Sequence, residues 1–259
     1  MSVAETEALQ TPTMRLDGLT AVVTGAGRGL GEGIAIALGD AGAEVVLVSR
    51  TQTELDAVAA TIAGRGGKAT PLVCDVTDTA QVKDKIEGLE RIDILMNNAG
   101  ANIPEPFVDV TEDHLDFLIE LNVKSMFTVA QAAMRRMLAG GRGGSMIHMS
   151  SQMGHVGSPR RTVYCMTKHA IEGLSKAIAA EGAEAAIRSN CIGPTFVETP
   201  MTKPMFENPE FHTFVMDRIL MGRLGKISDI TGSVVFLASP ASALVTGASL
   251  TIDGGWTAV

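Results

Sequence analysis

The chain has few aromatic residues, and Tyr164 is its only tyrosine. Aromatic residues make up 4% of the 259 residues, whereas 46% of the chain is hydrophobic and 28 residues are glycine. A composition rich in aliphatic and small residues is typical of a parallel sheet covered by closely packed helices. It excludes a collagen-like or disordered chain, and the length suffices for one large α/β domain whose core needs no disulfide.

Cysteine is also scarce, with Cys74, Cys165 and Cys191 the only three in the sequence. They are odd in number, dispersed along the chain, and lack the spacing of a metal or redox site. We therefore expect buried, unpaired thiols in a reducing compartment. The five histidines show no ligand spacing either, and we expect no catalytic metal.

Basic clusters and long apolar runs are missing as well. The net charge is −8, and no group of Lys or Arg exceeds a pair such as Arg160-Arg161, which argues against a nucleic-acid partner. No run approaches the roughly 18 to 20 apolar residues that cross a bilayer, so we expect no membrane span. Residues 1–14 carry two glutamates and no apolar stretch, which predicts a flexible N-terminal arm rather than a signal peptide. These features predict a soluble, cytoplasmic protein.

Short β-branched runs alternate with longer segments whose apolar residues recur at helical spacing. The expected strands are residues 20–25, 43–49, 69–76, 92–100, 144–151, 187–193 and 248–255. The expected helices include residues 30–38, 52–63 and 122–138. This alternation predicts right-handed βαβ units. We therefore expect an α/β protein whose residues 15–259 form a single-domain, doubly wound Rossmann fold: a seven-stranded parallel sheet with helices on both faces.

One segment departs from the alternation. Residues 194–225 contain four prolines and mix apolar with polar side chains. Long insertions in a compact domain often form lids or binding loops, so we interpret residues 194–225 as a substrate loop. A surface excursion without a role is the alternative.

A glycine-rich stretch, TGAGRGLGEG at residues 24–33, follows the first expected strand. Its glycines do not fit G-x-G-x-x-G, but Gly25, Gly29 and Gly31 fit T-G-x-x-x-G-x-G. Such glycines let the backbone approach a pyrophosphate, and the following helix offers free N–H groups. We expect these glycines, with Arg28 and Leu30 between them, to bind a dinucleotide.

The second expected strand ends in Ser49-Arg50 and carries no acidic residue there. An acid at this point usually binds the ribose 2′-hydroxyl of NAD, whereas an arginine accommodates the 2′-phosphate of NADP. Arg50, together with Arg28, therefore favours NADP(H), with NAD(H) still possible. The alternative is that both arginines are ordinary exposed residues.

Several motifs occur together in a characteristic order. They are T-G-x-x-x-G-x-G, NNAG at residues 97–100, Asn122, the pair Ser150-Ser151, and Tyr164 four residues before Lys168. In this combination the chain resembles the short-chain dehydrogenase/reductase family from Leu16 to its C-terminus. Tyr164 and Lys168 would share one face of a helix, and a cation beside a phenol stabilises the phenolate. The resemblance implies an NAD(P)-dependent oxidoreductase with Tyr164 as general acid/base, and commonly a homotetramer.

The resemblance also assigns individual roles. It implies that Ser151 binds the substrate oxygen and that Asn122 holds a water that connects Lys168 to solvent, which completes a catalytic tetrad. The implied cofactor contacts are Asp75 and Val76 to the adenine, Asn98, Ala99 and Gly100 beside the ribose, Tyr164 and Lys168 at the reacting end, and Pro194, Val197 and Thr199 near the carboxamide and phosphates. The chain departs from the family at Thr195, where a glycine is common.

The substrate side chains are expected after the NNAG motif, after the serine, and in residues 194–225. The polar candidates, beside Ser151 and Tyr164, are Asn102, Gln152, His155, Thr195 and Lys203. They suit a sugar, sugar acid or polyol whose secondary alcohol is interconverted with a ketone, although Met205, Phe206 and neighbouring apolar residues leave an apolar site open. A 3-oxoacyl-thioester reductase is an alternative. Glu181 and Glu184 argue against it, because their negative charges would repel an acidic carrier protein. A non-catalytic NAD(P)-binding sensor would not need Ser151, Tyr164 and Lys168 together.

Overall fold

The alternating runs of the sequence form a parallel sheet in the computed structural model, which describes residues 11–200 and 202–259. In this part of the chain the sheet has seven strands in the order β3-β2-β1-β4-β5-β6-β7, and every neighbouring pair is parallel. The strands are β1 (Thr20–Thr24), β2 (Glu44–Ser49), β3 (Lys68–Val73), β4 (Ile94–Asn97), β5 (Gly144–Met149), β6 (Ile187–Pro194) and β7 (Ser249–Ile252). All seven expected strands are confirmed, with most of them shorter than the apolar runs.

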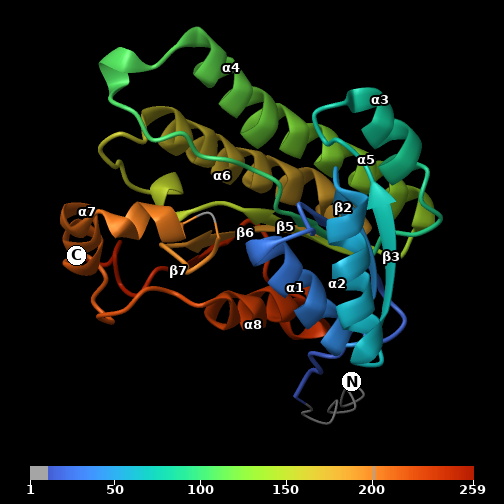
Figure 1. Ribbon diagram of the computed structural model, residues 1–259. Coiled ribbons are helices and arrows are strands. Elements are labelled where there is room, and N and C mark those ends of the chain that lie inside the picture. The colour runs from blue at the N-terminus through green and yellow to red at the C-terminus, as the bar shows by residue number, and fades with distance from the viewer. Residues whose placement is uncertain (1–10, 201) are drawn as a thin grey trace, which may run out of the picture.

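Helices cover both faces of the sheet (Figure 1). On one face lie α1 (Gly29–Asp40), α2 (Gln52–Gly64) and α8 (Ile227–Ala238); on the other lie α4 (Glu112–Ile119), α5 (Ser125–Gly140) and α6 (Thr162–Gly182). The shorter helices are α3 (Thr79–Gln81) and α7 (Pro209–Met216). The doubly wound architecture predicted from the sequence is thereby confirmed.

The strands explain why both faces are covered. Along β2, Val45 and Leu47 join the apolar cluster beneath α1, α2 and α8, whereas Val46 and Val48 join the cluster beneath α5. Successive side chains of a strand point to opposite faces, so a run with few polar residues must be buried on both.

Residues 194–200 and 202–225, which we interpret from the sequence as a substrate loop, lie at the carboxyl end of the sheet. They contain a 3₁₀ turn (Lys203–Glu207) and α7, and their aromatic side chains pack on Phe196 and Trp256. Of the expected N-terminal arm, residues 1–10 lie outside the described residues, as does Met201. Leu16 is already fully buried.

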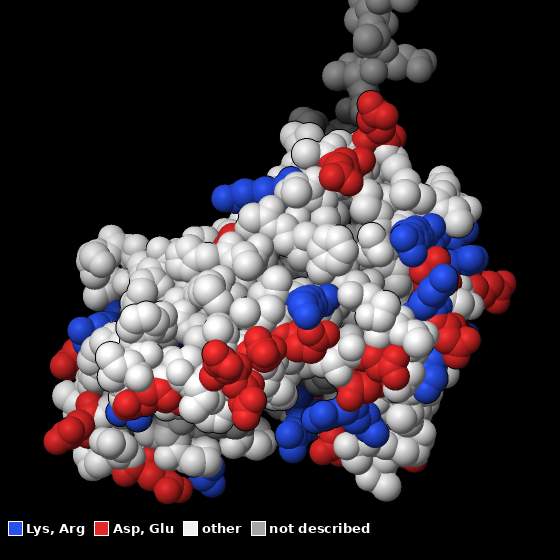
Figure 2. Space-filling model, turned by 90° about the horizontal axis from the view of Figure 1, so that it is seen from above, with Lys and Arg blue, Asp and Glu red and all other residues white. Residues whose placement is uncertain are grey.

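The surface carries charges of both signs. Figure 2 shows acidic and basic side chains interspersed over one face of the molecule. Among residues 11–200 and 202–259, no helix combines the length and the apolar character that a bilayer crossing requires. The three cysteines are unpaired and buried, as predicted.

His148 is a polar residue inside the sheet core. It lies on β5, is fully buried, and its Nε2 is 3.2 Å from Ser189 Oγ. Burial lowers the pKa of His148 to about 4 from its usual 6.5. The folded protein therefore holds this histidine neutral at pH values where the unfolded chain takes up a proton.

We predict an acid-dependent loss of stability from this residue. Between pH 6.5 and 4 only the unfolded state binds the proton at His148, so stability falls as the pH falls, by about 2 kcal/mol from pH 7 to pH 5. Urea unfolding at the two pH values measures the difference. His148→Gln should show a smaller difference than the wild type, and exposed His169→Gln should not. An unchanged pH dependence in His148→Gln would contradict the assignment.

Candidate functional site

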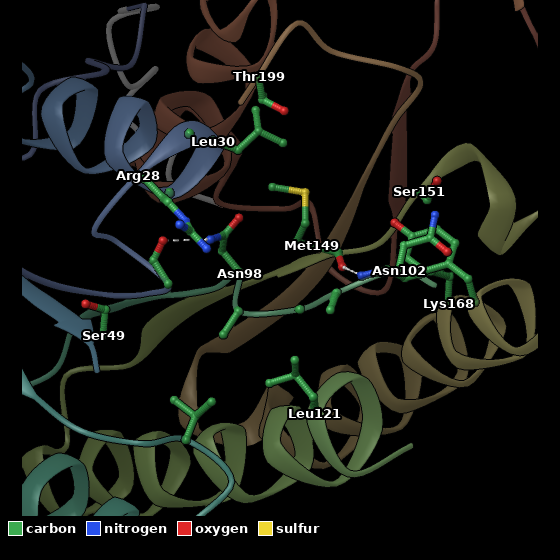
Figure 3. Close-up of a pocket in the computed structure, with 18 of the residues that line it drawn as sticks. Arg28, Leu30, Ser49, Asn98, Asn102, Leu121, Met149, Ser151, Lys168 and Thr199 are labelled. Atoms are coloured by element: carbon green, nitrogen blue, oxygen red, sulfur yellow. Dashed lines mark hydrogen bonds between the residues drawn. The ribbon is translucent and has the colours of Figure 1, made fainter. Parts of the chain in front are cut away.

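A pocket of about 1090 Å³ lies at the carboxyl ends of the strands. Its wall combines the glycine loop after β1 with the residues that follow β2, β3, β4, β5 and β6. Figure 3 shows Arg28 and Leu30 at one end and Asn102, Ser151 and Lys168 at the other. The strand order reverses between β1 and β4, and such a switch point opens a crevice between neighbouring loops.

The glycine loop leaves no room for side chains at Gly25 and Gly31. Gly25 has φ of 66°, and a Cβ there would lie 3.0 Å from Asn98 Nδ2. A Cβ on Gly31 would collide with the carbonyl of Gly25. The backbone itself therefore forms this part of the wall, which is the property a close-fitting pyrophosphate needs.

Helix α1 begins at Gly29 behind this loop. Its N-cap residue, Arg28, has extended backbone and makes no side-chain capping bond. The first N–H groups of the helix thus lack a side-chain acceptor, and together with the helix dipole they favour an anion. The loop and the helix start fit the diphosphate of a dinucleotide.

The expected cofactor residues converge in this one pocket. Its lining includes all of them: Gly25, Arg28, Gly29, Leu30, Gly31, Arg50, Asp75, Val76, Asn98, Ala99, Gly100, Tyr164, Lys168, Pro194, Val197 and Thr199. Arg28 is 78% exposed at its side chain and lies 3.8 Å from the Glu54 carboxylate. Such a loose, exposed pair contributes little, so the guanidinium is free to meet a phosphate.

A set of hydrogen bonds joins the ends of β1 and β4. The Thr24 hydroxyl accepts bonds from the backbone N–H groups of Asn98 and Ala99, at 2.9 and 3.1 Å. The Asn98 amide donates in return to the carbonyl of Thr24, at 2.9 Å. Asn98 therefore fixes the glycine loop rather than pointing freely into the pocket, a role the sequence alone did not indicate.

At the opposite end, α6 presents Tyr164 and Lys168 one turn apart. The Lys168 ammonium lies 5.3 Å from the centre of the Tyr164 ring and donates to the carbonyl of Met149 at 2.7 Å. Ser151, after β5, donates to Gln152 Oε1 at 2.7 Å and accepts from the N–H of Met153 at 3.1 Å. A hydroxyl, a phenol and an ammonium thus line one wall.

Burial dominates the electrostatics of this wall. It raises the pKa of Tyr164 to about 12, an effect that the Ser151 hydroxyl and the Arg161 guanidinium partly offset. It lowers the pKa of Lys168 to about 8. The phenol is therefore protonated at neutral pH, and any stabilisation of the phenolate by Lys168 must overcome the cost of burying the anion.

Asn122 lies behind the pocket wall in a π-helical turn (Glu120–Lys124) between α4 and α5. It is fully buried. Its side-chain Oδ1 accepts from the N–H of Ala101. Its side-chain Nδ2 donates to the backbone carbonyl of Ala101 and, at 3.3 Å, to Thr167 Oγ1. The sequence predicted a regular helix from residue 122, whereas α5 begins at Ser125. Turns of this kind occur frequently at functional sites.

Besides Ser151 and Tyr164, three of the expected substrate residues line the pocket, namely Asn102, Gln152 and Thr195. Asn102 Oδ1 and Thr195 Oγ1 are buried without a hydrogen-bond partner among the described residues. Buried polar atoms are rarely left unpaired in a protein, so both atoms are placed to bind a polar ligand.

His155 and Lys203 are not among the residues that line the pocket, so a contact of either with the substrate stays a prediction. His155 Nε2 lies 3.0 Å from Ser249 Oγ, on β7, and 3.5 Å from the Glu172 carboxylate. Lys203 opens an exposed turn. Their positions depend on tertiary contacts that loop sequence does not encode.

Known proteins resemble this chain over most of its length. A family model described as enoyl-(acyl carrier protein) reductase matches residues 25–257. L-xylulose reductase of Bos taurus is 36% identical, with 95% of this chain and 99% of that protein covered. A 3-oxoacyl-(acyl-carrier-protein) reductase of Thermotoga maritima is 36% identical over 93% of this chain and 99% of its own. The solved gluconate 5-dehydrogenase of Burkholderia cenocepacia, in complex with NADP and tartrate, has a TM-score of 0.91, 34% identity, and coverage of 95% of this chain and 98% of that one.

The glycine loop yields a prediction. Gly31→Ala should weaken NADPH binding at least tenfold and destabilise the fold by about 1–3 kcal/mol, because the added methyl collides with the Gly25 carbonyl and pushes the loop outward. Fluorescence titration with NADPH measures the affinity, and urea unfolding the stability. Gly232→Ala, in α8, meets no atom within 4 Å and should leave NADPH affinity unchanged. Wild-type affinity in Gly31→Ala would refute the prediction.

Proposed function

Because the chain belongs to the short-chain dehydrogenase/reductase family, we propose that its pocket interconverts a secondary alcohol and a ketone on a small polar substrate, with Tyr164 as the general acid/base. The chain is an NAD(P)-dependent oxidoreductase acting on CH–OH groups. The observation that carries the proposal is the convergence of Ser151, Tyr164 and Lys168 at one end of the pocket whose other end is the glycine cradle.

The preferred cofactor is NADP(H). The cradle fits it, since the glycine loop offers backbone to a diphosphate while Arg28 and Arg50 line the same end of the pocket. An arginine fork suits the 2′-phosphate that distinguishes NADP from NAD. When bound, the cofactor supplies or accepts the hydride.

The chain's own residues manage the proton and the substrate oxygen. We assign Tyr164 the transfer of a proton to the carbonyl oxygen in reduction, for which a phenol with a pKa of about 12 is present in its acid form at neutral pH. Ser151 donates to the same oxygen once its bond to Gln152 is exchanged. Lys168 stabilises the phenolate that remains, and Asn122 anchors the helix beside it.

The substrate class follows from the unpaired polar atoms. Asn102 Oδ1 and Thr195 Oγ1 lie in the pocket without partners among the described residues, and hydroxyl groups of a sugar, sugar acid or polyol would satisfy them. The names of the xylulose and gluconate relatives support this class.

The rival reading is a 3-oxoacyl-thioester reductase, supported by the relative from Thermotoga maritima. Against it, Glu181 and Glu184 place negative charge at the end of α6 and just beyond it, where an acidic carrier protein would be repelled. A non-catalytic sensor is disfavoured by the complete set of Ser151, Tyr164 and Lys168.

We also propose a homotetramer in the cytoplasm. Its support is three exposed apolar side chains, Phe117 on α4, Phe127 on α5 and Met166 on α6, which a subunit interface would cover. We further propose that residues 1–14 form a flexible arm and residues 15–259 the catalytic domain.

Tyr164→Phe tests the reaction. The variant should lose at least 10³-fold in kcat with NADP(H), because the proton donor is removed, while NADPH affinity stays within about twofold. Rates are measured on ketoses, ketoaldonates and a 3-oxoacyl thioester, with the wild type expected to reduce the sugar substrates and not the thioester. Retained activity in the variant would refute the mechanism, and turnover of the thioester alone would favour the rival reading.

Arg50→Ala tests the cofactor preference. Loss of a guanidinium from the 2′-phosphate should raise KM for NADPH about tenfold or more and leave KM for NADH nearly unchanged. Arg65→Ala provides the control, since Arg65 pairs with Asp40 away from the pocket. Equal changes with both cofactors would show that Arg50 does not read the 2′-phosphate.

A further inference from the structure

Arg161 is a buried cation beside the proposed reaction centre. It immediately precedes α6, three residues before Tyr164, and only 5% of the residue is exposed. Residues three apart at the start of a helix are neighbours. The Arg161 guanidinium opposes the rise in the pKa of Tyr164, which places its charge within electrostatic reach of the phenol.

The hydrogen bonds of Arg161 are poor for a buried guanidinium. Its Nη1 donates to the carbonyl of Arg160 at 3.4 Å, its Nη2 contacts Met205 Sδ at 3.8 Å, and its Nε is buried without a partner. No salt bridge joins Arg161 to a carboxylate within the described part of the chain. A buried charge is costly unless it is paired.

Arg188 shows how this chain otherwise satisfies a half-buried guanidinium. Its Nη1 donates to the carbonyl of Val245 at 3.2 Å, and its Nη2 to the carbonyl of Leu237 at 2.7 Å, with Ser239 at 3.5 Å. Arg161 has one carbonyl and one thioether, and a thioether is a weak acceptor. Compared with Arg188, Arg161 therefore has hydrogen-bond donors without a good acceptor.

The surroundings of Arg161 connect it to the pocket. Met205 lines the pocket, whereas Arg161 does not, and the Met205 thioether contacts the guanidinium. The Phe211 ring lies 5.8 Å from the guanidinium carbon. Methionine is flexible and adapts readily, so a small movement of Met205 would open the guanidinium to a ligand.

The backbone immediately before Arg161 is in an unfavourable conformation. Arg160 has φ of 60°, one of two described non-glycine residues with a left-handed backbone. This conformation is unfavourable for a side-chain-bearing residue, and such strain concentrates at functional sites. The strained turn places Arg161 inward while Arg160 stays exposed.

We propose that Arg161 binds the carboxylate of the substrate, so that the preferred substrates are sugar acids rather than neutral sugars or polyols. A guanidinium fork matches a carboxylate with two parallel hydrogen bonds. Met205 and Phe211 beside the guanidinium are uncharged, so the ligand has to balance the single positive charge of Arg161. A carboxylate carries one negative charge and does so, whereas a phosphate dianion carries two. The inference narrows the substrate class of the proposed function and rests on it.

Matched substrate pairs test the inference. Threonate, ribonate and gluconate are compared with threitol, ribitol and glucitol, in which a hydroxymethyl group replaces the carboxylate, using NADP⁺. The wild type should favour the acids in kcat/KM. Arg161→Met should lower kcat/KM for the acids roughly 10- to 100-fold, the range for a lost charged hydrogen bond, mainly through KM. The alditols should lose much less than the acids, because only the effect of the Arg161 charge on the Tyr164 phenol reaches them. Affinity for NADP⁺ should change less than threefold, and Arg161→Lys should restore part of the loss.

The controls separate the possible failures. Arg160→Ala removes an exposed arginine next in sequence and should leave the ratio of acid to alditol unchanged. Thermal unfolding checks that Arg161→Met is folded. An equal loss for acids and alditols would show a structural role and overturn the inference, as would a wild type that favours the alditols. If the wild type oxidises none of the six, the proposed function fails, and calorimetric binding of gluconate with NADP⁺ present, in wild type and Arg161→Met, still decides whether Arg161 binds a carboxylate.

Discussion

The pocket depends on the hydrogen bonds between Thr24 and Asn98, where the strand order reverses. At this point β1 and β4 are neighbours, but their chains leave toward opposite faces of the sheet. The Thr24 hydroxyl accepts two backbone N–H groups from the β4 side, and the Asn98 amide binds the β1 side in return. These reciprocal bonds hold the glycine loop against the end of β4 so closely that neither Gly25 nor Gly31 accommodates a side chain. The geometry of the dinucleotide cradle is therefore set by the sheet and not by the loop alone.

The reactive end of the pocket is governed by the same burial that stabilises the fold. Enclosing Tyr164 and Lys168 moves their pKa values apart, to about 12 and about 8, because burial penalises both the phenolate and the ammonium. Burial thus keeps the Tyr164 phenol protonated at neutral pH. Oxidation of an alcohol needs the phenolate, whereas reduction needs the phenol, and the protonated phenol is therefore the form that reduction uses.

Much of this arrangement was predictable from the sequence, and the exceptions share a cause. The strands follow from local β-branched runs, and Tyr164 and Lys168 share a face because four residues make about one helical turn. By contrast, the π-helical turn at Asn122 is stabilised by bonds to Ala101 and Thr167, which are distant in sequence. His155 likewise turns toward Ser249, and Arg161 becomes buried only when Met205 and Phe211 pack over it. Periodicity and motif spacing report local structure, and these residues are placed by tertiary contacts.

The two ends of the pocket are built from different kinds of structure, and this difference bears on specificity. The cofactor end consists of backbone and strand termini whose positions are fixed by the sheet. The other end is lined in part by Phe196 and Met205, and Phe206 and Phe211 pack on Phe196, which in turn packs on Trp256 near the C-terminus. Substitutions in this aromatic cluster reshape the substrate wall without disturbing the sheet, because they touch neither the glycine loop nor the bonds between Thr24 and Asn98. In the function proposed here, substitutions in this aromatic cluster would change recognition of the substrate more than binding of the cofactor.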